Sequence, residues 1–195
     1  IAVYFFYGLA FFVMGLALLF VGRRTSQLRF ALAVVPLAAF GLLHASHEWY
    51  EMFQKIGAAA VELSNENIYT DETVLANFVM DTLRRKIGAH LALSTSSSFR
   101  ASIPPGDMLM EDYQAAQPFK NFIMVTELTG AQVRDLLNLS VSKRATDNFS
   151  QQSGARFTIR NGQAQDIQIH KDPADPSQGY EALDDAKTYK VATTD

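Results

Sequence analysis

The distribution of hydrophobic residues divides the chain into an apolar N-terminal part and a longer part of mixed composition. Residues 3–21 form an uncharged run, and a second, shorter apolar run covers residues 30–45 and is broken by Pro36. At about 1.5 Å per residue, the first run is long enough to cross the hydrocarbon core of a bilayer. We therefore expect residues 1–56 to be a membrane segment, with two transmembrane helices folded as a hairpin.

Three arginines between these runs predict how the hairpin is oriented. They are Arg23, Arg24 and Arg29, and positive charge in a short loop marks the cytoplasmic side of a membrane protein. Both ends of the hairpin should then face outward, which places the remainder of the chain in the periplasm or outside a bacterial cell. A signal peptide fits less well, because the run lacks a basic n-region and a small-residue cleavage site.

Two histidines near the end of the second run raise the hypothesis of a metal site. His44 and His47 are three residues apart and Glu48 follows, so their side chains could share one face of a helix. This order differs from the H-E-x-x-H of zinc proteases. The aromatic residues Trp49 and Tyr50 come next, which favours the interfacial end of a membrane helix.

Residues 74–87 carry the clearest helical pattern of the soluble part, and Gly88 follows as a stop signal. We expect its core face to contain Leu75, Phe78, Val79, Leu83 and Ile87, and its solvent face Asp81, Arg84 and Arg85.

The remaining pattern predicts a layered α/β domain with a mixed sheet. Residues 91–93 and 122–125 form short apolar runs typical of strands, and residues 111–116 predict a short helix. Residues 129–132 read Thr-Gly-Ala-Gln, a capping box that starts another helix. Two alternating strands flank residues 161–162, Asn-Gly, a pair typical of a hairpin turn.

Charge and cysteine content narrow the function classes. The chain carries 20 acidic and 17 basic residues and no cysteine. The excess of acid and the absence of a basic stripe argue against nucleic acid as a partner. Disulfides and thiolate metal sites are excluded.

A loop of small hydroxyl residues is the strongest candidate for a binding site. The predicted strand at residues 91–93 leads into Ser-Thr-Ser-Ser-Ser at residues 94–98, and the loop ends at Arg100. Small residues let backbone N–H groups approach a ligand closely. A guanidinium adds a planar fork of donors for an anionic or polar ligand.

The order of short motifs along residues 61–195 resembles the C-terminal domain of the 5′-nucleotidase family. The family motifs read roughly E-x-N-L-G-N, N-G-G-G-I-R, P-F-G-N, E-L-T-G, S-G-x-x and Y-x-V-A-x-N-x-F. Their counterparts here are 72–77 (ETVLAN), 95–100 (TSSSFR), 118–121 (PFKN), 127–130 (ELTG), 153–156 (SGAR) and 189–192 (YKVA). Residues 1–56 in turn resemble the membrane sensor region of bacterial signalling proteins.

The first resemblance implies a substrate-binding domain that works beside a separate metallophosphatase domain. In the family, that other domain holds two divalent metals and hydrolyses the phosphate ester. Its D-x-H, N-H-D/E and G-H-x-H motifs are absent here, so we expect no catalytic residue, metal or cofactor in this chain. By position, Arg100 corresponds to the arginine that contacts the nucleotide, Phe119 to the first of two aromatics that sandwich the base, and Thr95 to the loop asparagine.

Three departures from the family pattern bear on the ligand. Thr95 removes an amide that both donates and accepts, and residues 96–98 are serines where the family has glycines. The family's second aromatic clamp would follow the position of Asp195 and is not expected within residues 71–195. We expect residues 71–195 to be an incomplete substrate-binding domain that binds a nucleoside or nucleotide, joined by a linker at 57–70 to the membrane segment.

The predicted function is that of a nucleotide-binding domain of a membrane-tethered, 5′-nucleotidase-like hydrolase of nucleotide catabolism. The alternatives are a membrane sensor or receptor whose extracytoplasmic domain binds a ligand without catalysis, and an inactive fusion fragment.

Overall fold

The computed structural model describes residues 2–24, 31–173 and 175–194. The chain divides into two compact units, one of residues 1–58 and 107–115, the other of residues 59–106 and 116–195. Within the segment predicted as a linker, Leu63 and Ile68 are buried side chains of the second unit. Residues 25–30 of the loop on which the predicted orientation rests, Arg29 among them, lie outside the described residues.

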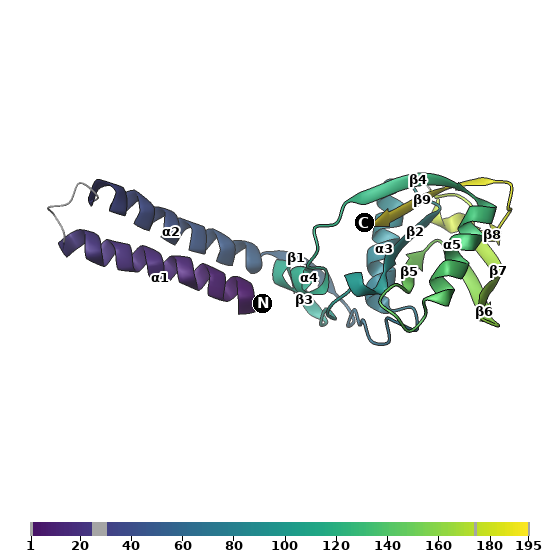
Figure 1. The fold of residues 1–195 in the computed structure, drawn as a ribbon, viewed down its shortest axis with the longest axis horizontal. Helices are drawn as coiled ribbons and strands as arrows, with labels where there is room; N and C mark the ends of the chain where they lie inside the picture. The colour runs from purple at the N-terminus through teal and green to yellow at the C-terminus, as the bar shows by residue number, and fades with distance from the viewer. Residues whose placement is uncertain (1, 25–30, 174, 195) are drawn as a thin grey trace. The chain divides into compact units, whose positions relative to one another are not determined.

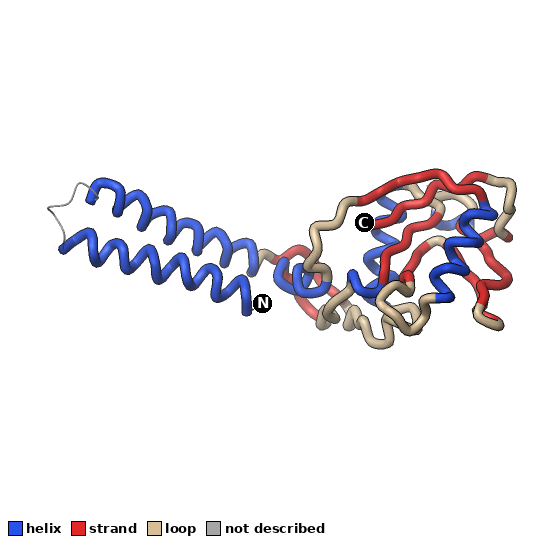
Figure 2. The backbone as a smooth tube through the Cα atoms, in the orientation of Figure 1, coloured by secondary structure: helices blue, strands red, loops and turns tan. Residues whose placement is uncertain are grey.

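The first unit consists of a helical hairpin, a short helix and most of a two-stranded sheet. The elements are α1 (Ala2–Arg24), α2 (Ala31–Met52), β1 (Lys55–Ala59), β3 (Gly106–Leu109) and α4 (Met110–Ala116). Helices α1 and α2 lie side by side (Figure 1 and Figure 2). They approach closely at two glycines, because a Cβ atom on Gly15 would lie 3.0 Å from the carbonyl oxygen of Ala38, and one on Gly41 2.9 Å from that of Phe11.

The two predicted helices of the hairpin are therefore present, but their predicted passage through a membrane is not supported. Among the described residues, no helix is long and apolar enough to cross a membrane. The last turns of α2 are polar, with His44 3.7 Å from Glu48 and His47 3.5 Å from Glu51.

The second unit is built on a four-stranded sheet with strand order β4-β9-β2-β5. Its elements are α3 (Val74–Ile87), β2 (Leu91–Thr95), η1 (Ser96–Ser98), β4 (Ile123–Thr129), α5 (Gly130–Ser142), β5 (Ser150–Ser153), β6 (Ala155–Arg160), β7 (Gln163–His170), η2 (Pro176–Gln178), β8 (Tyr180–Ala182) and β9 (Thr188–Thr194). Strand β2 pairs in parallel with β9, whereas the pairs β4–β9 and β2–β5 are antiparallel. The sheet is mixed, which confirms the predicted α/β class.

A second, antiparallel sheet has the order β6-β7-β8. The turn between β6 and β7 is the predicted Asn-Gly pair, with φ of 51° at Asn161 and 72° at Gly162. Positive φ at both central residues is what a tight hairpin turn of matching twist requires.

Alternation along β2 shows how the layers are stacked. Ala92 packs with Leu83 and Ile87 of α3, whereas Leu91 and Leu93 belong to the larger core formed with α5, β7 and β9. Because successive strand residues point to opposite faces, α3 covers one face of the sheet. Helix α5 and the second sheet cover the other.

Local signals set the helix starts as predicted. The Thr73 side chain accepts a hydrogen bond from the backbone N–H of Ala76 at the start of α3, and Gly88 ends that helix in the left-handed conformation. At the start of α5, Thr129 and Gln132 form the complete capping box. Such caps satisfy backbone groups that the helix leaves unpaired at its ends.

The predicted faces of α3 need correction. Phe78, which we expected in the core, is 47% exposed, whereas Arg84, which we expected in solvent, is 3% exposed. Arg84 is buried because its Nε donates to Oγ of Ser153 at 2.8 Å, and that hydroxyl in turn donates to Asp81. A hydrogen-bonded guanidinium can thus occupy a position that the apolar pattern assigns to solvent.

Candidate functional site

The hydroxyl loop begins where β2 leaves the core. The strand is buried from Leu91 to Ser94 and becomes exposed at Thr95. The single turn of η1 follows, and Phe99 returns to the core with 1% of its surface exposed. The buried strand and the buried ring of Phe99 fix both ends of a short loop, at the same end of the sheet.

A chain of hydroxyl contacts holds the loop. Oγ of Ser94 lies 3.0 Å from Oγ of Ser98 and 2.7 Å from Oγ1 of Thr194 on β9. Oγ1 of Thr95 lies 3.1 Å from Oγ of Ser97 and 3.3 Å from Oγ of Ser98. Because a hydroxyl both donates and accepts, these side chains satisfy one another, and none of the four loop residues from Thr95 to Ser98 needs a positive φ.

Two backbone N–H groups of the loop bond within the protein, contrary to our expectation that the N–H groups of the loop are open to a ligand. The N–H of Ser96 donates to the carbonyl oxygen of Phe149 at 2.7 Å, and that of Ser97 to Asp147 at 3.2 Å. Oγ of Ser96 lies 2.6 Å from the carbonyl oxygen of Ile68. The backbone N–H groups of Ser96 and Ser97 are therefore not available to a ligand.

Arg100 and Phe119, the two main binding candidates, lie against each other. The guanidinium carbon of Arg100 is 5.9 Å from the centroid of the Phe119 ring, within cation–π distance. The backbone N–H of Arg100 donates to Ala116 at 2.8 Å, and the guanidinium donates to the Ser97 carbonyl at 3.4 Å. These bonds tie the end of the loop to the segment that carries the aromatic ring.

The Arg100–Phe119 pair offers a ligand an exposed aromatic ring for stacking and a guanidinium for hydrogen bonding. Phe119 is 52% exposed, so a planar base can stack on its ring. The arginine supplies further N–H donors in one plane for a hydroxyl or a phosphate oxygen. Thr95 reaches the pair through Ser97, whose hydroxyl contacts Thr95 and whose carbonyl accepts from Arg100.

Two residues that shape this site were not predicted from the sequence. Ser97 links Thr95 to Arg100, and Thr194 fixes Ser94 from the neighbouring strand. The partners Ser94 and Thr194 are 100 residues apart in the chain, so only the parallel pairing of β2 with β9 brings them together.

Exposed apolar side chains continue from Phe119 into β4. Phe122 is 78% exposed, and the first three residues of β4, from Ile123 to Val125, are each about half exposed. The predicted apolar strand at 122–125 is thus part of a longer edge strand with solvent-facing side chains.

The donor set for a metal is also absent from the described part of the chain. No three histidine, aspartate or glutamate side chains among those residues are close enough to hold a metal ion. The ring of His44 instead packs 4.6 Å from that of Phe11 and 5.5 Å from that of Phe40. The metal hypothesis for His44, His47 and Glu48 therefore finds no support, and the described residues do not fit a two-metal centre.

His90 lies at the opposite end of β2, in surroundings that oppose its protonation. Burial and the positive charge of Lys187 lower the pKa of His90, although Asp172 and Glu181 act in the other direction. The neutral ring is also needed as an acceptor, because its Nδ1 takes a hydrogen bond from the backbone N–H of Lys190 at 3.0 Å.

We expect this histidine to make the second unit less stable in mild acid. Since the pKa of His90 is lower when folded than the 6.5 of the unfolded chain, the unfolded state binds the proton first. The stability that depends on neutral His90 is therefore complete above pH 6.5. It is lost as the pH falls from 6.5 towards the lower pKa of His90 in the folded state. His90→Asn keeps an acceptor for Lys190 but cannot titrate.

Denaturant unfolding between about pH 5 and 8 measures the effect. The free energy of unfolding should fall less steeply with acid in His90→Asn than in His47→Asn, which serves as an exposed control. Equal slopes would contradict the assignment.

With this geometry in place, comparison with known proteins identifies the family. A family model for the 5′-nucleotidase C-terminal domain matches residues 55–195. The chain belongs to the 5′-nucleotidase C-terminal domain family. The match covers all the residues of the candidate site, whereas the resemblance of residues 1–56 to a membrane sensor region finds no support.

Relatives of this 5′-nucleotidase C-terminal domain include two bacterial proteins. It is 29% identical over 150 residues to the trifunctional nucleotide phosphoesterase protein YfkN of Bacillus subtilis, covering 72% of this chain and 10% of that protein. It is 27% identical over 124 residues to protein UshA of Escherichia coli, covering 63% of this chain and 21% of that one. The chain thus spans a small fraction of the length of these relatives.

The fold agrees with a solved member of the family. The crystal structure of a 5′-nucleotidase precursor from Thermus thermophilus superposes with a TM-score of 0.64 at 26% identity, covering 82% of this chain and 33% of that one. The layered α/β arrangement of the second unit is therefore that of the family.

Proposed function

We propose that the second unit binds the nucleoside part of a nucleotide, as the binding domain of a 5′-nucleotidase-like hydrolase. The observation that carries the proposal is the exposed Phe119 ring with the Arg100 guanidinium 5.9 Å from its centroid, at the carboxyl end of β2. Membership of the family supports a nucleotide as the ligand.

Each side chain of the site has a distinct role in this proposal. The Phe119 ring stacks on the base, and Arg100 donates hydrogen bonds to polar atoms of the ligand. The hydroxyl of Thr95 takes the place of the family's asparagine amide. Because a hydroxyl has fewer donors and acceptors than an amide, Thr95 should discriminate less strongly between bases.

Hydrolysis itself is assigned to groups outside this chain. The residues described here provide no metal-binding cluster, and phosphate ester hydrolysis in the family depends on two divalent metals held by a metallophosphatase domain. This domain would present the nucleoside to that centre rather than react with it. In this proposal the two domains act together in nucleotide catabolism.

A chemical-shift titration of the full chain with adenosine tests the binding site. In detergent micelles, adenosine should shift the resonances of Thr95, Arg100 and Phe119 first, with an affinity in the millimolar range, on the order of −4 kcal/mol. Inosine and AMP serve as related ligands that vary the base and add a phosphate. A folded protein whose shifts bypass these three residues would contradict the proposed site.

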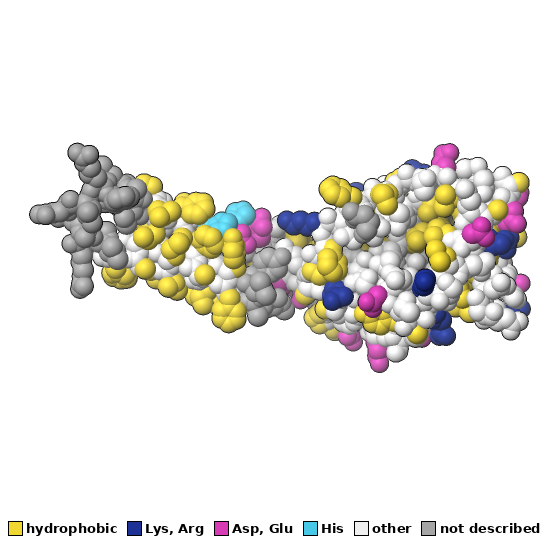
Figure 3. Space-filling model, viewed as in Figure 1, with side chains coloured by type: hydrophobic (Ala, Val, Ile, Leu, Met, Phe, Trp, Pro, Cys, Tyr) yellow, Lys and Arg dark blue, Asp and Glu magenta, His cyan; other side chains and the backbone are white. Residues whose placement is uncertain are grey.

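We further propose that the α1–α2 hairpin attaches the protein to a bacterial membrane, with the second unit in the periplasm or outside the cell. The face of the hairpin that Figure 3 shows carries many hydrophobic side chains, and Phe6 and Leu43 are 62% and 72% exposed. The close contacts at Gly15 and Gly41 are the small-residue packing favoured between helices in lipid.

Fractionation and a fused reporter test the attachment. The full chain should sediment with membranes and stay there after alkaline carbonate washing, and an export-dependent reporter fused after Asp195 should be active. A chain that begins at Ala59 is the matched control for the hairpin. Release of the full chain by carbonate, or an inactive reporter on well-expressed protein, would contradict attachment or orientation respectively.

A further inference from the structure

Ser96 fixes the hydroxyl loop to the body of the second unit. Its side chain is fully buried, whereas Thr95 before it is exposed. The backbone N–H of Ser96 donates to the carbonyl oxygen of Phe149 at 2.7 Å, and its own carbonyl accepts from the N–H of Phe99 at 3.2 Å. Its Oγ lies 2.6 Å from the carbonyl oxygen of Ile68 and 2.7 Å from that of Phe149. All three polar groups of this one loop residue are therefore bonded within the protein.

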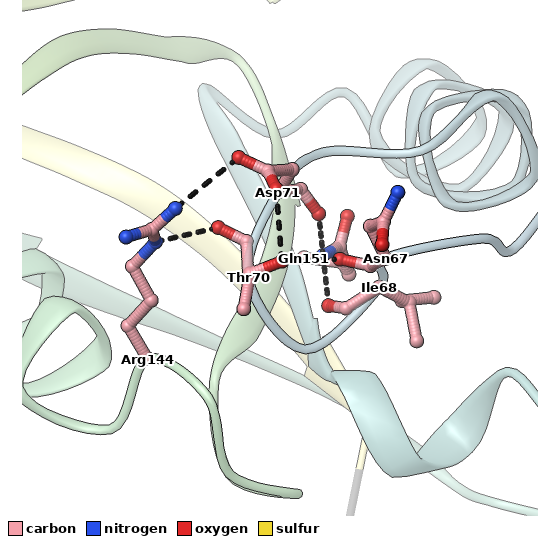
Figure 4. Close-up of polar contacts among 6 residues, drawn as sticks. All are labelled: Asn67, Ile68, Thr70, Asp71, Arg144 and Gln151. Carbon is pink, nitrogen blue, oxygen red and sulfur yellow. Dashed lines mark hydrogen bonds and ion pairs between the residues drawn. The ribbon is translucent and has the colours of Figure 1, made fainter.

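The Ile68 carbonyl that Ser96 reaches belongs to a turn that other elements hold in place (Figure 4). Nε2 of Gln151, on β5, donates to the carbonyl oxygens of Ile68 and Asp71, both at 2.7 Å. Arg144, which follows α5, has its guanidinium 3.3 Å from the Asp71 carboxylate. The Ile68 carbonyl is thus a fixed point, because two elements outside the hydroxyl loop hold the turn around it.

The anchored serine is followed directly by the residue that holds Arg100. The carbonyl oxygen of Ser97 accepts a hydrogen bond from the Arg100 guanidinium at 3.4 Å, and that guanidinium lies 5.9 Å from the centroid of the Phe119 ring. An N–H···O bond of this length is weak, so it positions the arginine only while the Ser97 carbonyl stays in place. A loop that shifts at Ser96 would release Arg100 from the ring.

We propose that Ser96 is a positioning residue for the nucleoside site, an inference that rests on the proposed function. Because its side chain is buried, Ser96 does not touch the ligand. Its hydroxyl instead holds the loop against Ile68, so that Thr95 and Arg100 meet the ligand already ordered. Ordering a loop during binding lowers affinity. The family's glycine at this position has no hydroxyl, so this anchor depends on the serine.

Ser96→Ala tests this role with little effect expected on the fold. Without the hydroxyl, the Ile68 carbonyl still accepts from Gln151, and the Phe149 carbonyl still accepts from the backbone N–H at position 96. Neither buried carbonyl loses its last donor, which would be the costly outcome. In the full chain in detergent micelles, the dispersion of core resonances should be retained. Adenosine should bind about fivefold more weakly, the effect of one lost hydrogen bond.

Two further variants separate positioning from a general loss of stability. Thr129→Ala, the matched control, removes a hydroxyl that caps α5 at the far end of β4 from Phe119, and should leave the affinity for adenosine unchanged. Arg100→Gln should weaken adenosine by itself. Adding Ser96→Ala to it should weaken binding by less than about twofold further, because the serine acts through the arginine. Equal affinities of Ser96→Ala and the wild type, equal losses in Ser96→Ala and Thr129→Ala, or losses that multiply in the double variant would each overturn the proposal.

Hydrogen exchange of the wild-type chain tests the anchor without any substitution. The backbone N–H groups of Ser96 and Ser97 should be protected without ligand, and adenosine should leave that protection unchanged. Protection that arises only with adenosine would show that the ligand orders the loop, and would overturn the proposal. The proposed function fails separately, if adenosine leaves the wild-type resonances of Thr95, Arg100 and Phe119 unshifted while both N–H groups are protected.

Discussion

Replacing Gly154 with alanine is expected to destabilise the second unit by at least about 3 kcal/mol. Gly154 has a φ of 100°, in the region that side chains rarely adopt, and a Cβ atom there would overlap the carbonyl oxygen of His90. It would also lie 2.7 Å from Cδ of the buried Arg84. Neither group can move freely, because His90 precedes the central strand and Arg84 is hydrogen-bonded to Ser153.

The turn glycine Gly162 provides the control for this prediction. Its φ of 72° is also positive, but a Cβ atom there would meet nothing within 4 Å. Gly162→Ala should therefore lower the free energy of unfolding only by the cost of holding alanine at a positive φ, about 1 kcal/mol. Urea unfolding of the full chain, followed by near-UV circular dichroism, measures both variants. Similar losses in the two would show that crowding at Gly154 is not the dominant effect.

The second large effect concerns the ligand. Phe119→Ala should weaken binding of adenosine and of AMP to a similar extent, by about 5- to 150-fold, because a base-stacking ring contributes about 1–3 kcal/mol. The ring is 52% exposed and belongs neither to the core cluster around Leu91 nor to the one around Ala92, so the fold should tolerate its removal. The measurement is the same chemical-shift titration, with the dispersion of core resonances as a check of folding.

Phe78→Ala is the matched control for Phe119→Ala. Phe78 is 47% exposed on helix α3, outside the proposed nucleoside site, and its loss should leave the affinity for adenosine unchanged. If the two variants bind adenosine alike, the ring of Phe119 does not stack on the base. If Phe119→Ala weakens AMP but not adenosine, the ring is acting on the phosphate side of the ligand instead.

Parts of the structure that depend on neighbouring residues could be predicted well from the sequence. The capping box of α5 and the stop at Gly88 involve contacts within one turn of helix. The Asn161-Gly162 turn depends on the backbone preferences of two residues. Such signals are local, so they keep the same meaning wherever the segment lies in the fold.

The N-terminal helical hairpin shows where a one-dimensional pattern is weaker. An uncharged run indicates where a helix can form, and both helices do form. Whether a helix crosses a bilayer depends on the length and hydropathy of the complete surface that it presents to lipid. No helix among the described residues meets that requirement, so attachment rests on the proposed experiments.

The sequence alone determined the family and the α/β class, because ordered motifs and local turns survive as patterns along the chain; Arg100 and Phe119 remain predicted binding residues. Only the tertiary structure decided what those residues contact. Parallel pairing of β2 with β9 brings Thr194 to Ser94, and Ser153 allows Arg84 to be buried where the helical pattern assigned it to solvent. The hydrogen bond from the Gln151 amide to the Asp71 carbonyl oxygen likewise joins distant segments, 80 residues apart in the chain. Contacts between distant segments are set by how the layers pack, and no periodicity in the chain encodes that packing directly.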